Sequence, residues 1–210
     1  MILETIAVQG VLPILRDTRP KVLVDLGLAL QAGGCQVLEI TLMSEGAFEA
    51  IRHLSDRGLQ LGAGTVMNRE QALRAQGAGA QFLVSPGLCG ELLEAPPLPY
   101  FPGVATPSEV MQALRFEQTT LKLFPAEPLG GVAMLQALRG PFPQVRWLPT
   151  GNIRLEQVSD YLNAGAMAVG MGSQLFPRAE VEAGEWDKIS ARFASTQDLG
   201  VTASPPNKPR

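Results

Sequence analysis

Short apolar runs alternate with longer amphipathic segments along nearly the whole chain. An apolar run of strand length bounded by glycine or proline is typical of a β-strand, and apolar residues three and four positions apart are typical of a helix. The pattern predicts eight strands, each built around one such run. They are expected at residues 11–16, 37–42, 59–65, 81–86, 100–105, 120–124, 146–151 and 166–172.

The amphipathic segments predict a helix after each strand and one short helix, at residues 2–8, before the first strand. Pro20 precedes the first of the later helices and Gly33 follows it, as start and stop signals do. One strand and its helix span about 20–28 residues, which is the size of a βα unit. The later helices are expected at residues 21–32, 45–57, 69–76, 90–94, 107–116, 131–138, 155–164 and about 181–195.

Eight consecutive βα units most naturally close into a (β/α)8 barrel, the TIM barrel. The strands are nearly continuous apolar runs, which suits a parallel sheet covered by helices. A doubly wound open sheet is the alternative, but no G-x-G-x-x-G motif follows the first strand. We predict one α/β barrel domain with a short N-terminal helix over residues 1–197. The polar, proline-rich residues 198–210 are predicted to be a disordered tail.

Composition excludes several classes of partner. The formal net charge is −3 and only 6% of residues are aromatic, so no basic, base-stacking surface for nucleic acid is expected. No apolar run reaches membrane-spanning length, and the N-terminus lacks the basic start of a signal peptide. Cys35, Cys89 and the single His53 stand far apart, which argues against a zinc site. Free thiols fit a reducing compartment, so we expect a cytoplasmic protein.

One lysine stands inside a predicted strand. Lys122 lies in an apolar run, whereas Lys21, Lys188 and Lys208 lie in polar or amphipathic segments. A buried ammonium is costly unless it is paired or loses its proton, and a neutral lysine amine attacks carbonyl carbons. Lys122 is therefore a candidate Schiff-base nucleophile. The alternative is a lysine on the polar face of an edge strand.

Glu39 is the second polar residue enclosed by an apolar run. Side chains alternate along a strand, so Glu39 shares a face with Thr41, and Lys122 shares a face with Phe124. If both faces point into the barrel, an amine and a proton-shuttling carboxylate converge in one pocket, as Schiff-base chemistry requires. Alternatively, Glu39 only forms an ion pair with Lys122 or Arg16.

Catalytic groups of a parallel barrel lie at the C-terminal ends of its strands. The last two predicted strands end in glycine-rich turns, residues 149–152 and 170–173, whose backbone N–H groups could hold an anion next to helix N-termini. Tight turns alone are the alternative. Gly62 and Gly64 are interpreted as partly structural, because glycine permits close backbone approach in a crowded barrel. Polar residues near predicted strand ends are Arg16, Glu39, Thr65, Ser85, Thr106, Lys122, Thr150 and Ser173.

An ordered set of motifs resembles one known family, the class I 2-keto-3-deoxy-6-phosphogluconate (KDPG)/4-hydroxy-2-oxoglutarate (KHG) aldolases, which are (β/α)8 barrels. Each motif alone is weak, but their order through nearly the whole chain is specific. They are VLEITL (37–42), GAGTV (62–66), FLVSPG (82–87), PGVATPSE (102–109), LKLFPAE (121–127), GPF (140–142), LPTG (148–151) and VGMGS (169–173).

The resemblance implies roles for individual residues. Lys122 would form the Schiff base, and Glu39 would move protons. Substrate would be bound by the remaining candidates. Thr65, Pro86 and Phe124 would surround its pyruvyl part, Gly151, Gly172 and Ser173 would hold its phosphate, and Thr150 is a further substrate-binding candidate.

The chain departs from the family pattern at two positions. Some members carry a carboxylate-binding arginine two residues after the Thr of Glu-x-Thr, where this chain has Met43. Other members have an arginine at the end of the first strand, which Arg16 matches, so we assign the substrate carboxylate to Arg16. The usual Gly-Gly after the seventh strand is Gly151-Asn152 here. Asparagine tolerates a positive φ, so phosphate binding is expected to survive.

The resemblance implies an aldehyde-lyase that needs no metal or organic cofactor and forms a homotrimer. Its small-molecule substrates would be 2-keto acids and aldehydes: KDPG cleaved to pyruvate and glyceraldehyde 3-phosphate, or KHG cleaved to pyruvate and glyoxylate. Two alternatives keep the same scaffold. They are a phosphosugar isomerase or epimerase, which needs no imine, and a non-catalytic phosphosugar-binding protein.

Overall fold

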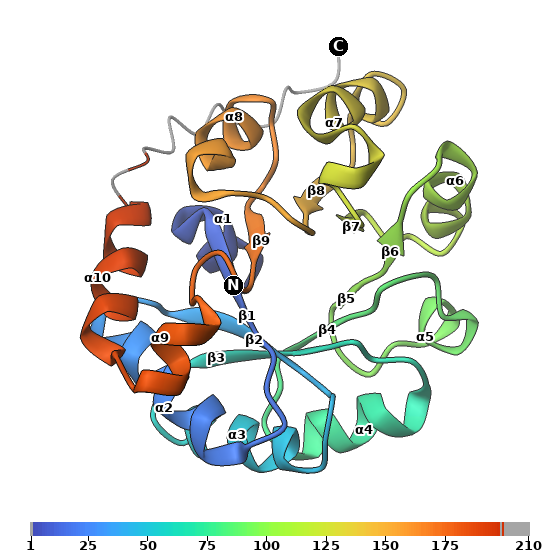
Figure 1. Ribbon diagram of the computed structural model, residues 1–210. Coiled ribbons are helices and arrows are strands. Elements are labelled where there is room, and N and C mark those ends of the chain that lie inside the picture. The colour runs from blue at the N-terminus through green and yellow to red at the C-terminus, as the bar shows by residue number, and fades with distance from the viewer. Residues whose placement is uncertain (1, 198, 200–210) are drawn as a thin grey trace.

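The computed structural model of the protein describes residues 2–197 and 199 (Figure 1). Strands lie at the centre of the molecule and helices surround them. Every strand pair in the described residues is parallel. The strands are β1 (Val11–Leu15), β2 (Val37–Thr41), β3 (Gln60–Gly64), β4 (Phe82–Val84), β5 (Tyr100–Phe101), β6 (Gly103–Val104), β7 (Thr120–Leu123), β8 (Arg146–Pro149) and β9 (Val169–Met171).

The strands form two parallel sheets, with the orders β5-β4-β3-β2-β1-β9 and β6-β7-β8. All eight predicted strands are present, but the one predicted at residues 100–105 is divided into β5 and β6. Pro102 causes this division because it has no N–H to donate to a neighbouring strand, although its carbonyl still accepts from the Lys122 amide at 2.9 Å. The parallel sheet curls into a half-barrel, which confirms the α/β class.

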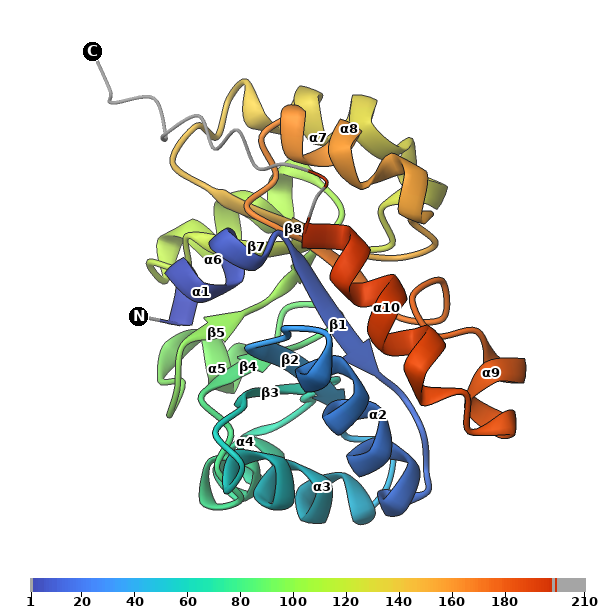
Figure 2. The same ribbon diagram turned by 90° about the vertical axis from the view of Figure 1, so that its left-hand side faces the viewer.

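Helices follow the strands as predicted, except near the C-terminus. The single helix predicted at residues 181–195 is two helices, because Gly184, with φ 67°, ends the first of them in the left-handed conformation. The second packs beside α2, with α9 at its end (Figure 2). The helices are α1 (Ile2–Gln9), α2 (Pro20–Ala32), α3 (Gly46–Ser55), α4 (Arg69–Gly77), α5 (Gly90–Glu94), α6 (Pro107–Arg115), α7 (Gly131–Arg139), α8 (Val158–Asn163), α9 (Arg178–Ala183) and α10 (Trp186–Gln197), with 3-10 turns η1 (Glu127–Leu129) and η2 (Leu155–Gln157).

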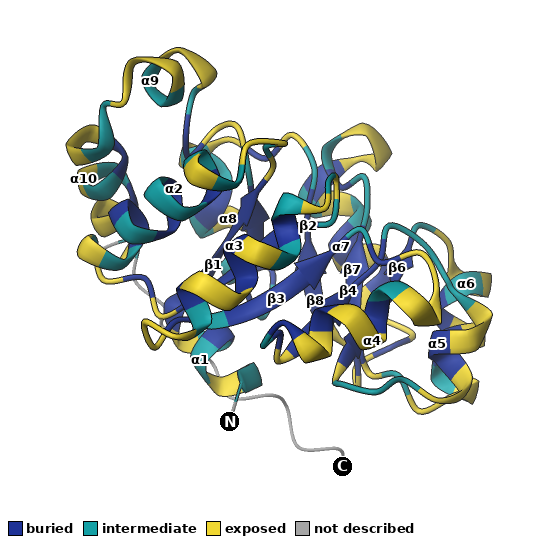
Figure 3. Ribbon diagram, turned by 90° about the horizontal axis from the view of Figure 1, so that it is seen from below, coloured by how far each residue is buried: buried dark blue, intermediate teal, exposed yellow. Residues whose placement is uncertain are grey.

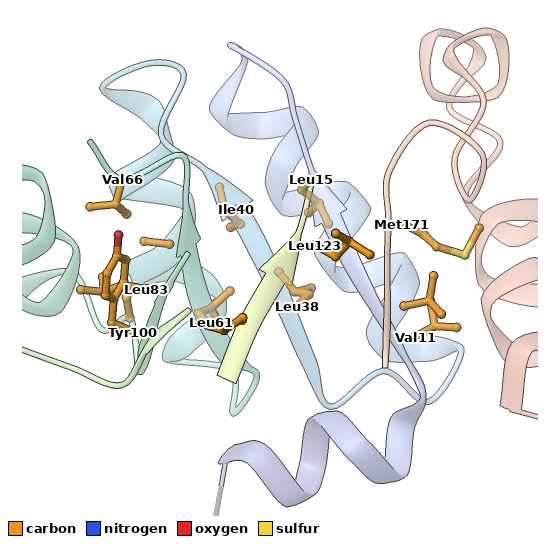
Figure 4. Packing of buried hydrophobic residues seen from close by; sticks show 14 of the residues in the cluster. Val11, Leu15, Leu38, Ile40, Leu61, Val66, Leu83, Tyr100, Leu123 and Met171 are labelled. Atoms are coloured by element: carbon orange, nitrogen blue, oxygen red, sulfur yellow. The ribbon is translucent and has the colours of Figure 1, made fainter. Parts of the chain in front are cut away.

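The core has two parts because the strands are buried on both faces (Figure 3). Leu38, Leu61 and Leu123 belong to a large cluster of buried apolar residues to which the strands and the surrounding helices contribute (Figure 4). A second, smaller cluster combines alternate strand residues such as Val37 with Ile6 of α1. The alternation of Leu38 with Val37 and Glu39 therefore places Glu39 on the same side of β2 as Val37 and the second cluster.

The C-terminal residues and membrane-spanning segments were also considered in the sequence predictions. The tail predicted to be disordered, residues 198–210, lies outside the described residues apart from Leu199, whose amide donates to the Thr196 carbonyl. Among the helices of residues 2–197, none combines the length and the apolar character needed to span a membrane.

Candidate active site

A cleft of about 820 Å³ opens where β1, β7, β8 and β9 end. Its walls come from residues in or just after these strands, as expected for the C-terminal end of a parallel sheet. Four predicted site residues, Lys122, Glu39, Thr65 and Pro86, lie outside its lining. The predicted site residues that do line it are Arg16, Phe124, Thr150, Gly151, Gly172 and Ser173.

Lys122 belongs to β7, two residues before Phe124, which lines the cleft. Only 6% of its surface is exposed, as its apolar neighbours predict. Its Nζ lies 5.2 Å from the centroid of the Phe124 ring, so the two side chains share one face of the strand, and Phe124 lines the cleft. Within the described residues no carboxylate lies within ion-pair distance of Nζ. Lys122 is thus a buried amine without a salt bridge, next to a cleft.

Glu39 is fully buried in β2. Neither carboxylate oxygen has a hydrogen-bond partner in the described part of the protein. Burial raises the pKa of Glu39, and the positive charges of Lys122 and Arg16 lower it to a smaller extent. Glu39 therefore interacts electrostatically with both basic residues but forms an ion pair with neither. The alternative in which Glu39 only forms an ion pair with Lys122 or Arg16 is wrong.

Glycines make the space that these side chains occupy. A Cβ on Gly64 would collide with the Glu39 carboxylate, and a Cβ on Gly62 would collide with the Phe82 ring. Both glycines belong to the GAGTV motif of β3, which the sequence indicated as a site of close packing. The space for a buried, unpaired carboxylate is therefore provided by the neighbouring strand rather than by Glu39 itself.

Thr65 and Pro86 lie beside the cleft rather than in its lining. Thr65 follows Gly64 and has φ 58°, a conformation that is rare for a β-branched residue and that concentrates at functional sites. The backbone of Pro86 packs against Gly103, which stands opposite Lys122 in the ladder between β6 and β7. Thr65 therefore follows the strand next to Glu39, and Pro86 contacts the strand next to Lys122; their contacts with substrate stay a prediction.

Backbone amides on two neighbouring turns line the same cleft. The N–H groups of Gly151 and Asn152 after β8, and of Gly172 and Ser173 after β9, donate to no backbone carbonyl among the described residues. Gly151 has φ 115° and Asn152 has φ 59°, which confirms that asparagine takes a positive φ where the family usually has a second glycine. Successive free amides in such a turn can bind an anion.

Arg16 places a positive charge in the cleft, and no group of the described residues pairs with it at close range. It follows β1 and is exposed, and it forms no hydrogen bond or ion pair with another described residue. Met43, 52% exposed, lines the same cleft at the position where some family members have arginine. A guanidinium with free donors suits a carboxylate, which it can hold by two parallel hydrogen bonds.

The outer rim of the cleft contains charged residues that were not predicted from the sequence. Arg19 binds Asp17 through two nitrogens, at 2.9 and 2.7 Å, and also reaches Glu182 of α9 at 3.2 Å. Arg178 lies 3.6 Å from the same glutamate. The Arg19 side chain lowers the pKa of Asp17. No local signal reveals this group, because Arg19 and Glu182 are 163 positions apart.

No three His, Cys, Asp or Glu side chains within residues 2–197 and 199 are grouped as metal ligands. Instead of metal ligands, the described residues provide protein groups that can act on an organic substrate. These are a buried amine, a buried carboxylate, an unpaired arginine and two turns with free amides. Such a set can form an imine, move protons and hold a substrate with two anionic ends.

Similarity to known proteins agrees with this chemistry. Residues 2–192 match the family model "KDPG and KHG aldolase". The KHG/KDPG aldolase of Escherichia coli K12 is 42% identical over 193 residues, which cover 89% of this chain and 91% of the relative.

Two solved structures are similar over most of their length. A KDPG aldolase from Legionella pneumophila, with pyruvate captured as a covalent carbinolamine intermediate, has a TM-score of 0.86 and 34% identity and covers 93% of this chain and 98% of its own. The KDPG aldolase of Zymomonas mobilis ZM4 with 3-phosphoglycerate has a TM-score of 0.83 and 33% identity, with coverages of 92% and 94%. This chain therefore belongs to the KDPG and KHG aldolase family.

Proposed function

We propose that this protein is a class I aldolase that cleaves KDPG to pyruvate and glyceraldehyde 3-phosphate, or KHG to pyruvate and glyoxylate. The observation that carries the proposal is the buried, salt-bridge-free Lys122 beside a buried carboxylate of raised pKa. The family assignment supports an aldolase over the isomerase and the binding protein, neither of which needs this pair. Release of pyruvate from KDPG and from KHG, measured separately, is the direct test.

The reaction begins at Lys122. Its neutral amine attacks the C2 carbonyl of the 2-keto acid, and loss of water gives an iminium that accepts electrons. Removal of the C4 hydroxyl proton then breaks the C3–C4 bond, releasing the aldehyde and leaving a pyruvyl enamine on the lysine. Protonation at C3 and hydrolysis of the imine free pyruvate and regenerate the amine. The sequence of steps consumes no cofactor.

Glu39 carries the protons in this scheme, acting on the C4 hydroxyl through a water molecule. A general base works best when its pKa lies near the working pH, and burial moves the Glu39 pKa in that direction. Without hydrogen-bond donors on either oxygen, the carboxylate has free positions to accept a proton from substrate or water. Gly64 keeps the space that this exchange requires.

The two ends of the substrate are held by separate groups. Arg16 binds the carboxylate, Thr65, Pro86 and Phe124 surround the pyruvyl carbons, and Thr150 lines the wall between them and the turns. The amides of Gly151, Gly172 and Ser173 bind the phosphate. The distinction matters because the carboxylate is common to every 2-keto acid, whereas only some carry phosphate.

Loss of Arg16 is expected to weaken every substrate. A hydrogen bond to a charged group contributes about 1.5–3 kcal/mol, so Arg16→Ala should lower kcat/KM about ten- to a hundredfold for phosphorylated and unphosphorylated acids alike. Because Arg16 has no close partner in the described residues, its loss leaves no buried charge behind. Steady-state kinetics with 2-keto-3-deoxygluconate and its 6-phosphate measure both effects.

A bulky side chain at residue 172 is expected to harm only the phosphorylated acid. A Cβ on Gly172 would lie 3.4 Å from the Ile14 carbonyl, which is tolerable, so the rest of a leucine side chain would point into the cleft. Gly172→Leu should therefore reduce kcat/KM for the 6-phosphate and spare 2-keto-3-deoxygluconate. Equal losses for both acids, or no advantage from phosphate in the unmodified protein, would leave the turns without a phosphate-binding role.

We also propose that the strands close into one (β/α)8 barrel domain over residues 1–197. Continuous chain through Pro102 links the two sheets on one side, and an isolated parallel bridge between Thr150 and Gly170 links them on the other. A cytoplasmic location is proposed as well, since both Cys35 and Cys89 are free thiols.

A homotrimer is expected in solution, as the family resemblance implies. Large apolar side chains are exposed on the α4 and α6 segments, including Leu73, Met111 and Phe116, with exposed fractions of 47%, 60% and 38%. Such side chains lie beyond those needed to cover the strands and are candidates for a subunit interface. Light scattering at micromolar concentration should give three times the mass of one chain, and a monomer mass would contradict the assembly.

A further inference from the structure

Outside the cleft, one carboxylate joins three elements. Glu127 opens the turn η1 after the Lys122 strand. One of its carboxylate oxygens accepts from the hydroxyl of Tyr161 in α8, and the other accepts from Nε2 of Gln157 in η2 at 2.9 Å. Neither Glu127 nor its two partners line the cleft, and the mechanism above does not use them.

The backbone around Glu127 is attached to the proposed phosphate turn. The N–H of Glu127 donates to the Gly151 carbonyl at 3.2 Å, and the N–H of Ala126 donates to the Thr150 carbonyl at 2.8 Å. A Cβ on Gly151 would lie 3.2 Å from the Cα of Pro125, so the two turns are in close contact. Any shift of Glu127 would therefore move the carbonyls that orient the free amides of the phosphate turn.

The surroundings of the carboxylate are built around it. Tyr161 is fully buried. Burial raises its pKa most and the hydrogen bond to Glu127 raises it further, so the hydroxyl keeps the proton that it donates. A Cβ on Gly131, which has φ 61°, would lie 2.9 Å from the Glu127 Oε1, so glycine leaves room for the carboxylate here. The two donors come from different elements, so the one carboxylate links η1 to both η2 and α8.

We propose that Glu127 is a positioning residue that holds the Thr150–Asn152 turn in register with Phe124 and Lys122, so that one substrate meets the imine lysine and the phosphate amides at the same time. The inference rests on the proposed function, because it concerns the phosphate turn of that site. Glu127 acts through backbone hydrogen bonds and touches no reacting atom. Its loss should therefore affect binding of the phosphate end and leave imine formation intact.

Glu127→Gln tests this role with little change in side-chain shape. Glutamine offers one acceptor oxygen where two donors point, so one of the two hydrogen bonds is lost. KM for 2-keto-3-deoxygluconate 6-phosphate is expected to rise about tenfold or more, because one hydrogen bond to the side chain at residue 127 is lost, while kcat changes little. KM for 2-keto-3-deoxygluconate should stay within about twofold, and borohydride trapping of pyruvate on Lys122 should be retained. Tyr161→Phe, which keeps the carboxylate, should give a smaller shift in the same direction.

A matched control separates positioning from general destabilisation. Glu109 of α6 also uses its carboxylate for local hydrogen bonds, to the N–H groups of Ala105 and Thr106, but neither partner belongs to the phosphate turn at residues 150–152. Glu109→Gln should lower Tm without changing the ratio of the two KM values. If Glu127→Gln fails to fold, Tyr161→Phe and inhibition by inorganic phosphate provide the same comparison.

The outcomes distinguish the two proposals. If phosphate gives the unmodified protein no advantage, the phosphate part of the proposed function fails and the role of Glu127 fails with it. If the unmodified protein prefers the phosphorylated acid and Glu127→Gln keeps that preference, only the positioning role is overturned. A parallel loss with both substrates would likewise overturn it, since a merely structural residue gives that result.

Discussion

Replacing Lys122 by arginine is expected to abolish aldol cleavage. Arginine has a comparable length, but its guanidinium retains its proton and forms no imine with a carbonyl. The strand should still fold, because Lys122 makes no ion pair within the described residues that arginine would break. Pyruvate release from KDPG measures the loss. An isomerase or epimerase on the same scaffold would need no imine, so its activity would not depend on an amine at this position.

Trapping the intermediate identifies the lysine directly. Pyruvate with borohydride should leave a stable adduct on Lys122 of the unmodified protein, located by mass spectrometry of its peptides. Lys188→Arg is the matched control, because Lys188 is 62% exposed and pairs with Glu185 at 2.8 Å. That variant should keep full activity and the adduct. An adduct on Lys21 or Lys188, or no adduct at all, would contradict the mechanism.

Replacing Glu39 by glutamine is expected to lower kcat about 10²- to 10⁴-fold, which is the usual contribution of a positioned acid–base group. Glutamine keeps the shape of the side chain, so the cleft and Arg16 should be unaffected. Slow imine formation at Lys122 should still be detectable by borohydride trapping. A variant that cleaves KDPG at the unmodified rate would show that another group or free water moves the protons.

The same substitution should stabilise the fold at neutral pH. Burial raises the native pKa of Glu39 above its ordinary value of 4.5, so the folded state holds this proton to a higher pH than the unfolded state does. The stability of the unmodified protein therefore falls as pH rises from the ordinary value through the raised native value. Glutamine removes this dependence.

Thermal unfolding at two pH values measures this effect. Relative to the unmodified protein, Glu39→Gln should gain Tm at pH 8 more than at pH 4, because the carboxyl is protonated in both states at low pH. An equal change in Tm at both values would mean that the buried carboxylate does not cost stability through its charge. Lower activity together with higher stability is the expected result for a charge that is kept for catalysis.

Local patterns were sufficient for the βα order and for the family, which similarity to known proteins confirms. The burial of Lys122 and Glu39 followed from their apolar neighbours, because a strand inside a covered parallel sheet is buried along its whole length. The shared face of Lys122 and Phe124 followed from the alternation of side chains. The roles assigned to the site residues remain predictions that the experiments above test.

Residues that interrupt a strand or a helix were harder to recognise from the sequence. Pro102 divides a predicted strand, and Gly184 divides a predicted helix, although both lie in patterns that look continuous. Each residue is tolerated inside or beside an element in some contexts and ends it in others. The outcome depends on whether the surrounding chain supplies a hydrogen-bond partner at that point, and sequence spacing does not contain this information.

Local patterns predicted the burial of Lys122 and Glu39 and the polar groups at strand ends, because apolar runs and alternation can be recognised within one segment of the chain. Three features appear only in the folded molecule: Glu39 has no ion pair within the described residues, Gly64 gives it room, and Arg19 meets Glu182 at the rim of the cleft. These contacts join residues on different strands and helices, up to 163 positions apart. Their distances depend on how the strands curl and on how the glycines let neighbouring side chains approach, and no spacing along a single chain specifies either.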